Sequence, residues 1–309
     1  MKMVAPTFKL PFSLLCVLSI VCFCRVSFSH DGPEHDIEEL TAQIEKEGAS
    51  ADLLLQRAIE YQVIKKTAEA IRDLEQAQQL EGGSPTILRE LGRAYFAAGK
   101  TNEALNTVTR GITAGASGSE RASLLMVRSE ILRPRKEYEK ALADAEEAIM
   151  EHPNNVEWYL DRSQLHALLK KTKERVKGIE EGIKATGSGL LEIELVDALI
   201  EDGQHAVALK KIEEELAASR IQSSWLIRRA KIRLAAKQNE VAKTDLVAAI
   251  NELNSRMSGT AVDPSLFADR GQAFELYGDR EQAHKDYSVA KERGLSDEWI
   301  NERIRATKK

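Results

Sequence analysis

Two arginines and one aromatic residue, Arg89, Arg93 and Phe96, form the group of side chains that most suggests a binding site. Arg89 and Arg93 are four residues apart, so on a helix they lie on one face. Guanidinium groups hold carboxylates through planar pairs of hydrogen bonds, and this group could therefore bind an acidic ligand. The alternative is a solvated charged face, in which the arginines pair with nearby acids of the chain: Glu90, Glu103 and Glu130.

A second set of arginines recurs along the chain, each just before a small residue: Arg57, Arg128, Arg162, Arg229 and Arg270. Such regular recurrence favours a structural role over one shared ligand. Candidate partners follow each arginine at a similar distance: Asp73, Asp144, Glu180, Asp245 and Asp286. We expect these residues to form ion pairs between consecutive helices.

Two histidines, His30 and His35, are the candidates for metal binding. A histidine at a free amino terminus can bind Cu(II) through its amine and its imidazole. There is no third fixed ligand nearby, and the remaining histidines lack the spacing of a metal site: His152, His166, His205 and His284. We therefore interpret the segment as an exposed tail and expect no cofactor.

The stretch from Pro85 to Gly111 predicts the elements that position these residues. Its apolar side chains recur at spacings of three and four, as in two short amphipathic helices: Leu88, Leu91 and Tyr95, then Ala104, Leu105 and Val108. Gly99 and Lys100 make the turn between the helices. Small residues stand where two antiparallel helices come closest: Gly92, Ala104 and Gly111. Such a hairpin cannot bury its own apolar face, so it needs copies of itself on either side.

This pattern of Leu-x-x-Leu-Gly-x-x-Tyr, followed by Ala, Val and Gly, resembles the tetratricopeptide repeat, a unit of about 34 residues. It recurs with drift in units that begin near residues 51, 85, 122, 156, 189, 223 and 264. Two units depart from it, with Arg175 where Ala is expected and Glu215 where a small residue is expected. The resemblance implies an all-α solenoid of about seven hairpins over residues 51–296, wound into a right-handed superhelix.

Both ends of the solenoid need a cover for their apolar faces. Residues 30–50 predict a polar tail, HDGPEH, followed by an amino-terminal capping helix that begins after Asp36. Residues 297–309 predict a carboxy-terminal capping helix. Small polar insertions at 115–119 and 256–263 separate some of the units.

The resemblance also implies where a ligand binds, because in this family the first helix of each hairpin lines a concave groove that usually holds a peptide. The corresponding positions are Arg89, Arg93 and Phe96 in the second unit and Met126, Glu130 and Arg133 in the third. The Lys/Asn carboxylate clamp of chaperone-binding members is not implied, since no matching asparagines occupy the groove positions.

Residues 1–29 have the layout of a secretory signal peptide. Lys2 and Lys9 precede an apolar run from Leu10 to Cys24, and Ser27-Phe28-Ser29 resembles a cleavage site. The alternatives are an uncleaved anchor and a lipoprotein signal. All three cysteines lie in this segment, so the mature chain would have neither disulfides nor thiol chemistry. We expect a periplasmic or secreted protein without a membrane span after cleavage.

The composition and the repeats together predict a binding protein. A net charge of −5 does not suggest a nucleic-acid ligand. The repeats occupy nearly the whole chain, and the common phosphate-loop, hydrolase and zinc-protease motifs are absent, so we expect no enzyme. The preferred function is a scaffold that binds a protein or peptide. The alternatives are a structural subunit of an envelope assembly and a metal-binding protein that uses His30 and His35.

Overall fold

The computed structural model describes residues 32–259, 262–295 and 298–308, and within these ranges the chain is all-α. The helices of the amino-terminal half are α1 (Pro33–Glu47), α2 (Ala51–Val63), α3 (Thr67–Glu81), α4 (Pro85–Ala97), α5 (Thr101–Thr113), α6 (Gly118–Leu132), α7 (Tyr138–Glu151) and α8 (Val156–Leu168). Those of the other half are α9 (Thr172–Thr186), α10 (Gly189–Glu201), α11 (His205–Ala218), α12 (Ser223–Ala235), α13 (Asn239–Arg256), α14 (Pro264–Tyr277), α15 (Arg280–Glu292) and α16 (Glu298–Thr307).

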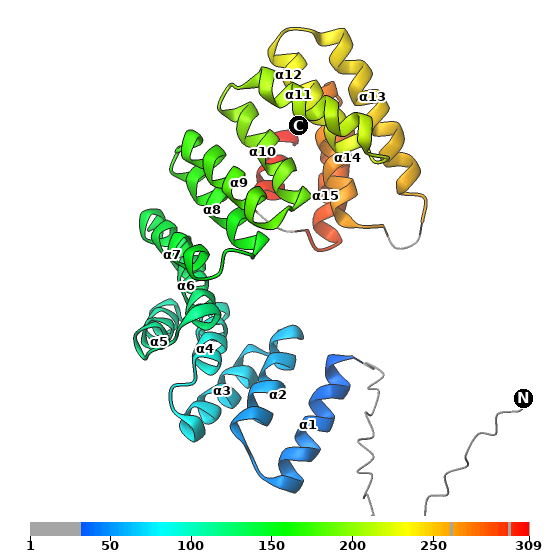
Figure 1. Cartoon of the computed structure of the whole chain (residues 1–309). Helices are drawn as coiled ribbons and strands as arrows, with labels where there is room; N and C mark the ends of the chain where they lie inside the picture. Colours follow the sequence, from blue (N-terminus) through cyan, green and yellow to red (C-terminus); the bar gives the residue numbers. More distant parts are fainter. Residues whose placement is uncertain (1–31, 260–261, 296–297, 309) are drawn as a thin grey trace, which may run out of the picture.

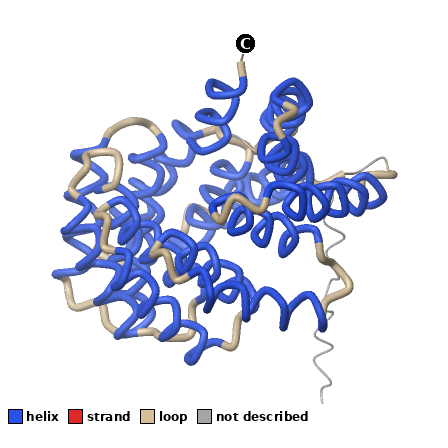
Figure 2. Tube along the Cα trace, turned by 90° about the horizontal axis from the view of Figure 1, so that it is seen from above, coloured by secondary structure: helices blue, strands red, loops and turns tan. Residues whose placement is uncertain are grey.

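Helices α2 to α15 pair into seven antiparallel hairpins, as the sequence predicts, and stack into a solenoid (Figure 1). The stack is curved, and a second view shows the helices wound around an open centre (Figure 2). Helices α1 and α16 pack on α2 and α15, at the two ends of the stack. No helix in the described part of the chain is both long and apolar enough to cross a membrane.

The first helices of the hairpins form the inner side of the curve. Helix α4 contacts α2 and α6, and α10 contacts α8 and α12, so neighbouring first helices pack directly on each other. The second helices lie farther apart, and α5 and α7 occupy the outer edge of the arc in Figure 1. Helices α6 and α8 are the exception among first helices, because they do not pack closely.

Small residues allow the two helices of a hairpin to touch. A Cβ atom built on Gly92 would lie 2.3 Å from Val108 Cγ2, and one built on Gly271 would lie 2.9 Å from the Tyr287 ring. The alanines in the Ala104 slot are completely buried: Ala70, Ala104, Ala141, Ala208, Ala242 and Ala283. The repeat spacing is therefore fixed by steric fit, since close-packed interiors tolerate little added volume.

The recurring arginines form ion pairs inside their hairpins, as predicted for four of the five. Arg57 Nε and Nη2 donate to the two carboxylate oxygens of Asp73 at 2.7 and 2.8 Å. The same bidentate geometry joins three further pairs: Arg128–Asp144, Arg229–Asp245 and Arg270–Asp286. Each acid is buried and lies sixteen residues after its arginine. In the second hairpin, Leu91 and Thr107 occupy these two positions.

The fourth hairpin breaks the pattern, and the predicted pair of Arg162 with Glu180 is wrong. Arg162 Nη2 donates instead to the carbonyl oxygen of Gly178 at 2.6 Å and to Glu181 at 3.1 Å. Gly178 stands where four of the other hairpins have Asp. Its missing side chain makes room for Arg162, whose guanidinium would lie 2.9 Å from a Cβ atom there. The departure therefore replaces a carboxylate partner by a backbone partner.

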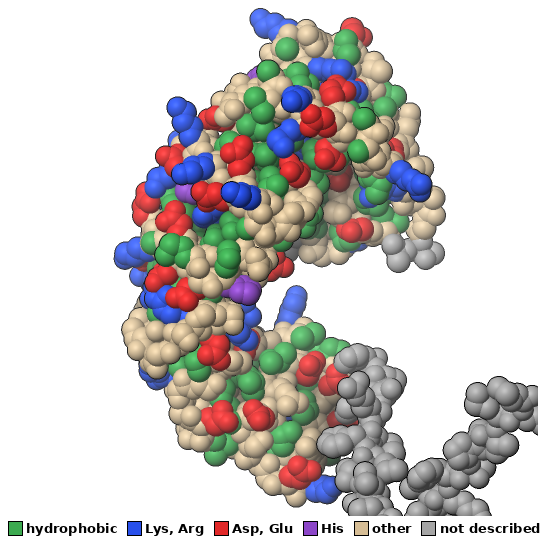
Figure 3. Space-filling view, in the orientation of Figure 1, with side chains coloured by type: hydrophobic (Ala, Val, Ile, Leu, Met, Phe, Trp, Pro, Cys, Tyr) green, Lys and Arg blue, Asp and Glu red, His purple; other side chains and the backbone are tan. Residues whose placement is uncertain are grey.

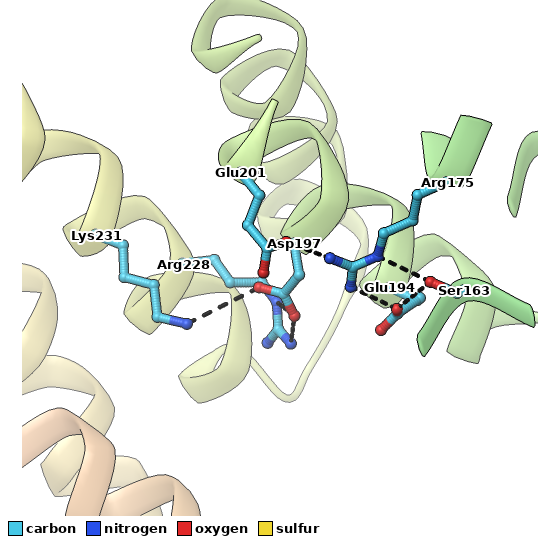
Figure 4. A network of polar contacts seen from close by, with 7 residues as sticks. All are labelled: Ser163, Arg175, Glu194, Asp197, Glu201, Arg228 and Lys231. Atoms are coloured by element: carbon cyan, nitrogen blue, oxygen red, sulfur yellow. Dashed lines mark hydrogen bonds and ion pairs between the residues drawn. The ribbon is translucent and has the colours of Figure 1, made fainter. Parts of the chain in front are cut away.

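Arg175, at the position expected to hold Ala, is buried, and all three nitrogens of its guanidinium group donate hydrogen bonds (Figure 4). It donates to Ser163 Oγ at 2.9 Å, to Glu194 at 2.7 Å and to Glu201. Ser163 also donates to Glu194 at 2.6 Å. A network that joins α8, α9 and α10 thus replaces the small-residue contact.

Two element boundaries differ from the sequence-based expectation. Helix α1 begins at Pro33 and not after Asp36, because Pro fits the first turn of a helix, where its missing N–H is not needed. Helix α6 begins at Gly118, so part of the expected 115–119 insertion is helical. The turns differ too, because the left-handed position filled by Gly99 is held by Lys in four other hairpins: Lys65, Lys136, Lys170 and Lys237.

The sixteen-residue spacing of the Arg–Asp ion pairs predicts how Arg57→Leu changes the stability of the protein. This change leaves Asp73 buried without its partner and should lower the free energy of unfolding by about 3 kcal/mol. The double variant Arg57→Leu/Asp73→Thr copies the second hairpin and should regain most of that loss. Urea denaturation followed by circular dichroism measures both variants. A double variant no more stable than the single one would contradict the equivalence of the Arg57–Asp73 and Leu91–Thr107 positions.

The buried His166 leads us to expect that the folded protein loses stability in mild acid. Its ring is buried, Nδ1 has no hydrogen-bond partner in the described chain, and burial lowers the pKa below its usual 6.5, with Arg162 adding to the effect. Protonation therefore favours the unfolded chain, and the contribution of His166 to stability is lost as the pH falls below the unfolded value. Between about pH 7.5 and about pH 5, His166→Gln should show a smaller fall in unfolding free energy than the unmodified protein. An equal fall in the unfolding free energies of the two proteins would exclude His166 as the cause of the acid sensitivity.

Candidate functional site

The concave side has a pocket of about 310 Å³ at the place where α6 and α8 separate. Three consecutive first helices contribute to it: Arg93 from α4, then Met126, Val127 and Glu130 from α6 with Arg133 at its end, and Glu157, Trp158 and Asp161 from α8. The looser packing of α6 on α8 is therefore what leaves the space.

Four of the six predicted groove residues line this pocket together: Arg93, Met126, Glu130 and Arg133. Arg89 and Phe96 do not line it. Phe96 packs against a buried cluster that includes Val127 and Ile131 of α6. Its ring therefore helps to join the second and third hairpins.

Arg89 and Arg93 share a carboxylate of their own chain. Arg89 Nε donates to Glu90 Oε1 at 2.8 Å, and Arg93 Nη1 lies 3.5 Å from the same oxygen. Glu90 is buried, whereas the Arg93 side chain is 49% exposed. Arg93 is thus held only weakly and keeps most of its donors available on the pocket rim, and Arg89 is engaged within its helix.

Arg133 spans the gap between α6 and α8. Its Nη2 donates to Asp161 Oδ1 at 2.5 Å, and Nη1 donates to Gln164 at 3.4 Å. Its Nε is buried and has no hydrogen-bond partner in the described chain. An unsatisfied buried donor is costly, so this N–H favours an acceptor group beside it.

Met126 and Trp158 give the pocket an apolar part. Both side chains are almost fully buried, and the Trp158 ring meets His152 edge-on with ring centroids 5.7 Å apart. The ionisable lining consists of two arginines and three acids: Arg93, Arg133, Glu130, Glu157 and Asp161. The pocket therefore combines an apolar surface with charges of both signs and is not a simple anion site.

Sequence reasoning missed the contribution of α8. Glu157, Trp158 and Asp161 belong to the fourth hairpin, and the groove positions considered were in the second and third. The available signal was the spacing of Arg133 and Asp161, which are 28 residues apart and so lie on neighbouring first helices.

A second group of charged residues lies farther along the first helices (Figure 4). Arg228 of α12 donates to Asp197 of α10 at 3.1 and 2.5 Å, and Lys231 Nζ lies 3.9 Å from the same acid. Burial lowers the pKa of Lys231 and raises that of Asp269 on α14. The ion pairs link the fifth and sixth hairpins, and together with Asp269 these charges extend over three successive first helices.

Metal binding finds no support in the described residues. They contain no group of three or more His, Cys, Asp or Glu side chains placed to hold a metal ion. His35 lies 3.3 Å from Glu39, and His30 lies outside the described residues. On the face seen in Figure 3, acidic and basic side chains are interspersed, without an extended basic patch of the kind that nucleic acids need.

Comparison with known proteins places this geometry in context. Residues 65–126 match the tetratricopeptide repeat family model. A tetratricopeptide repeat protein from Parabacteroides merdae is similar in structure, with a TM-score of 0.58, 18% identity and coverage of 88% of this chain and 99% of that one. The C-terminal part of a repeat-containing protein from Cytophaga hutchinsonii gives a TM-score of 0.55 at 13% identity, covering 82% and 98%. No curated protein matches the sequence.

Proposed function

We propose that this chain, in which residues 65–126 match the tetratricopeptide repeat family model and the whole described part has the fold of such proteins, is a non-catalytic scaffold that holds a protein or peptide ligand on its concave side. The family model and the fold support protein interaction in general. The finer assignment rests on one observation, the pocket that opens between α6 and α8 and brings together Arg93, Met126 and Arg133.

The groups in the pocket select the chemistry of the ligand. Arg93 offers exposed guanidinium donors, whereas Arg133 is held by Asp161 and Gln164. The donors of Arg93 favour a carboxylate or a carbonyl oxygen, and their fork geometry suits a carboxylate in particular. Met126 and Trp158 offer contact for an apolar side chain. We therefore assign the pocket to a peptide segment in which an acidic residue neighbours an apolar one.

The charges of the pocket also limit what can bind. Glu130 and Glu157 are exposed at its edge and repel a uniformly acidic ligand. Asp161 is already paired with Arg133, so it does not compete for Arg93. A ligand with a single acidic residue between apolar ones fits better than a polyacidic one, since only the first kind avoids like-charge contacts.

Binding of a labelled Leu/Glu peptide should depend on Arg93. We expect Arg93→Glu to weaken its affinity at least tenfold, about 1.4 kcal/mol, because the change replaces the rim cation by a like charge. Arg72→Glu makes the same charge change on exposed α3, outside this pocket, and should leave the affinity unchanged. Fluorescence anisotropy measures both. Equal affinity of all three proteins would remove the pocket assignment.

Export of the protein is part of the proposal and rests on the sequence of residues 1–29, which lie outside the described residues. The signal-like layout supports a periplasmic or secreted location. Amino-terminal sequencing of the protein from its own cells should give His30 as the first residue. An intact Met1 would argue against processing at Ser29.

A further inference from the structure

A second hollow, separate from the concave pocket, lies between the capping helix α1 and the first hairpin. It has a volume of about 370 Å³ and is lined by residues of α1 and α2 only: Asp36, Glu39, Leu40, Gln43, Gln56, Ile59 and Glu60. None of these residues lines the pocket assigned above. The hollow therefore needs its own explanation.

The floor of the hollow is apolar and partly open to solvent. Ile59, which lines it, is 39% exposed. Leu40 of α1 faces the same space and is only half-buried. Exposed aliphatic side chains that converge on a concave surface are characteristic of interaction sites.

The charged residues that line the hollow are all acidic. The ionisable lining residues are Asp36, Glu39 and Glu60, and neither Lys nor Arg is among them. Glu60 is half-buried and its carboxylate makes no hydrogen bond or ion pair in the described part of the chain. Helix α1 adds to this field, because it contains six acids and a single lysine.

We propose that this hollow docks a basic, amphipathic segment of a partner protein. An apolar side chain of that segment covers Leu40 and Ile59, which buries surface that α1 leaves exposed. A Lys or Arg of the segment reaches Glu60, whose carboxylate makes no ion pair in the described part of the chain. The acidic field of α1 attracts such a segment and disfavours acidic ones. The site is independent of the concave pocket and takes a ligand of opposite charge.

The test uses a labelled amphipathic Leu/Lys peptide and its Leu/Glu counterpart of equal length on the purified protein. Glu60→Lys should lower the affinity for the Leu/Lys peptide at least tenfold. Glu60→Gln should lower this affinity less, because it removes a charge without adding a repulsive one. Ile59→Ser should also weaken this peptide. Circular dichroism confirms that the variants fold.

A matched control separates docking from general charge attraction. Glu214→Lys makes the same charge change on exposed α11 and should leave the Leu/Lys affinity unchanged. Binding of the Leu/Glu peptide should stay the same in all the α2 variants, so failure of this proposal is distinct from failure of the concave pocket. Equal losses for Glu60→Lys and Glu214→Lys, or unchanged binding in every α2 variant, would overturn the proposal.

Discussion

Close contact between helices at small residues is the constraint on which this structure depends. The two helices of a hairpin approach so closely that there is no space for a side chain at Gly92 or Gly271, and in six of the seven hairpins a completely buried alanine fills the small-residue slot of the second helix. Burial of the apolar faces between successive hairpins then supplies the main stabilising free energy. Because each hairpin contacts only its neighbours, a change in the contact between two hairpins shifts the position of all the hairpins that follow. The position of a binding surface is thus decided by local packing.

Ion pairs of the charged side chains modify how the helices of this stack pack. Where Arg and Asp pair inside a hairpin, as in Arg57–Asp73, both charges are satisfied locally and the hairpin closes in the same way each time. Where the pattern changes, Arg162 binds the backbone of Gly178 within its own hairpin, and Arg175 reaches Glu194 in the next one. The opening between α6 and α8 lies directly before this change, and Arg133 bridges it. The proposed binding pocket and the irregular part of the solenoid are therefore adjacent.

The fold could be predicted from the sequence because small and apolar residues recur at one pitch. Four of the five arginine pairs followed from the same regularity, and the fifth failed because Gly178 carries no carboxylate. The site was harder to predict. Arg93, Met126 and Arg133 came from their positions in the repeat, but Arg89 turns to Glu90, the residue next to it, and Phe96 packs into the core.

The contribution of Trp158 and Asp161 could not be derived from a single unit. It depends on how far α8 is displaced from α6, and this displacement is a property of the stack. The hollow at α1 escaped prediction for the same reason, because Asp36 was assigned to the start of a capping helix and not to the wall of a pocket. Repeat patterns specify contacts within a unit well, whereas irregular contacts between units depend on individual side chains.

Site-specific photocrosslinking in the protein's own cells tests the central claim most directly. A photoreactive residue at Glu157, on the edge of the concave pocket, is compared with one at Lys210, on the exposed second helix of the fifth hairpin. A discrete protein or peptide adduct at 157, absent at 210 and lost on Arg93→Glu, is the predicted result. Adducts of equal yield at both positions, or none at 157, would contradict a ligand held on the concave side.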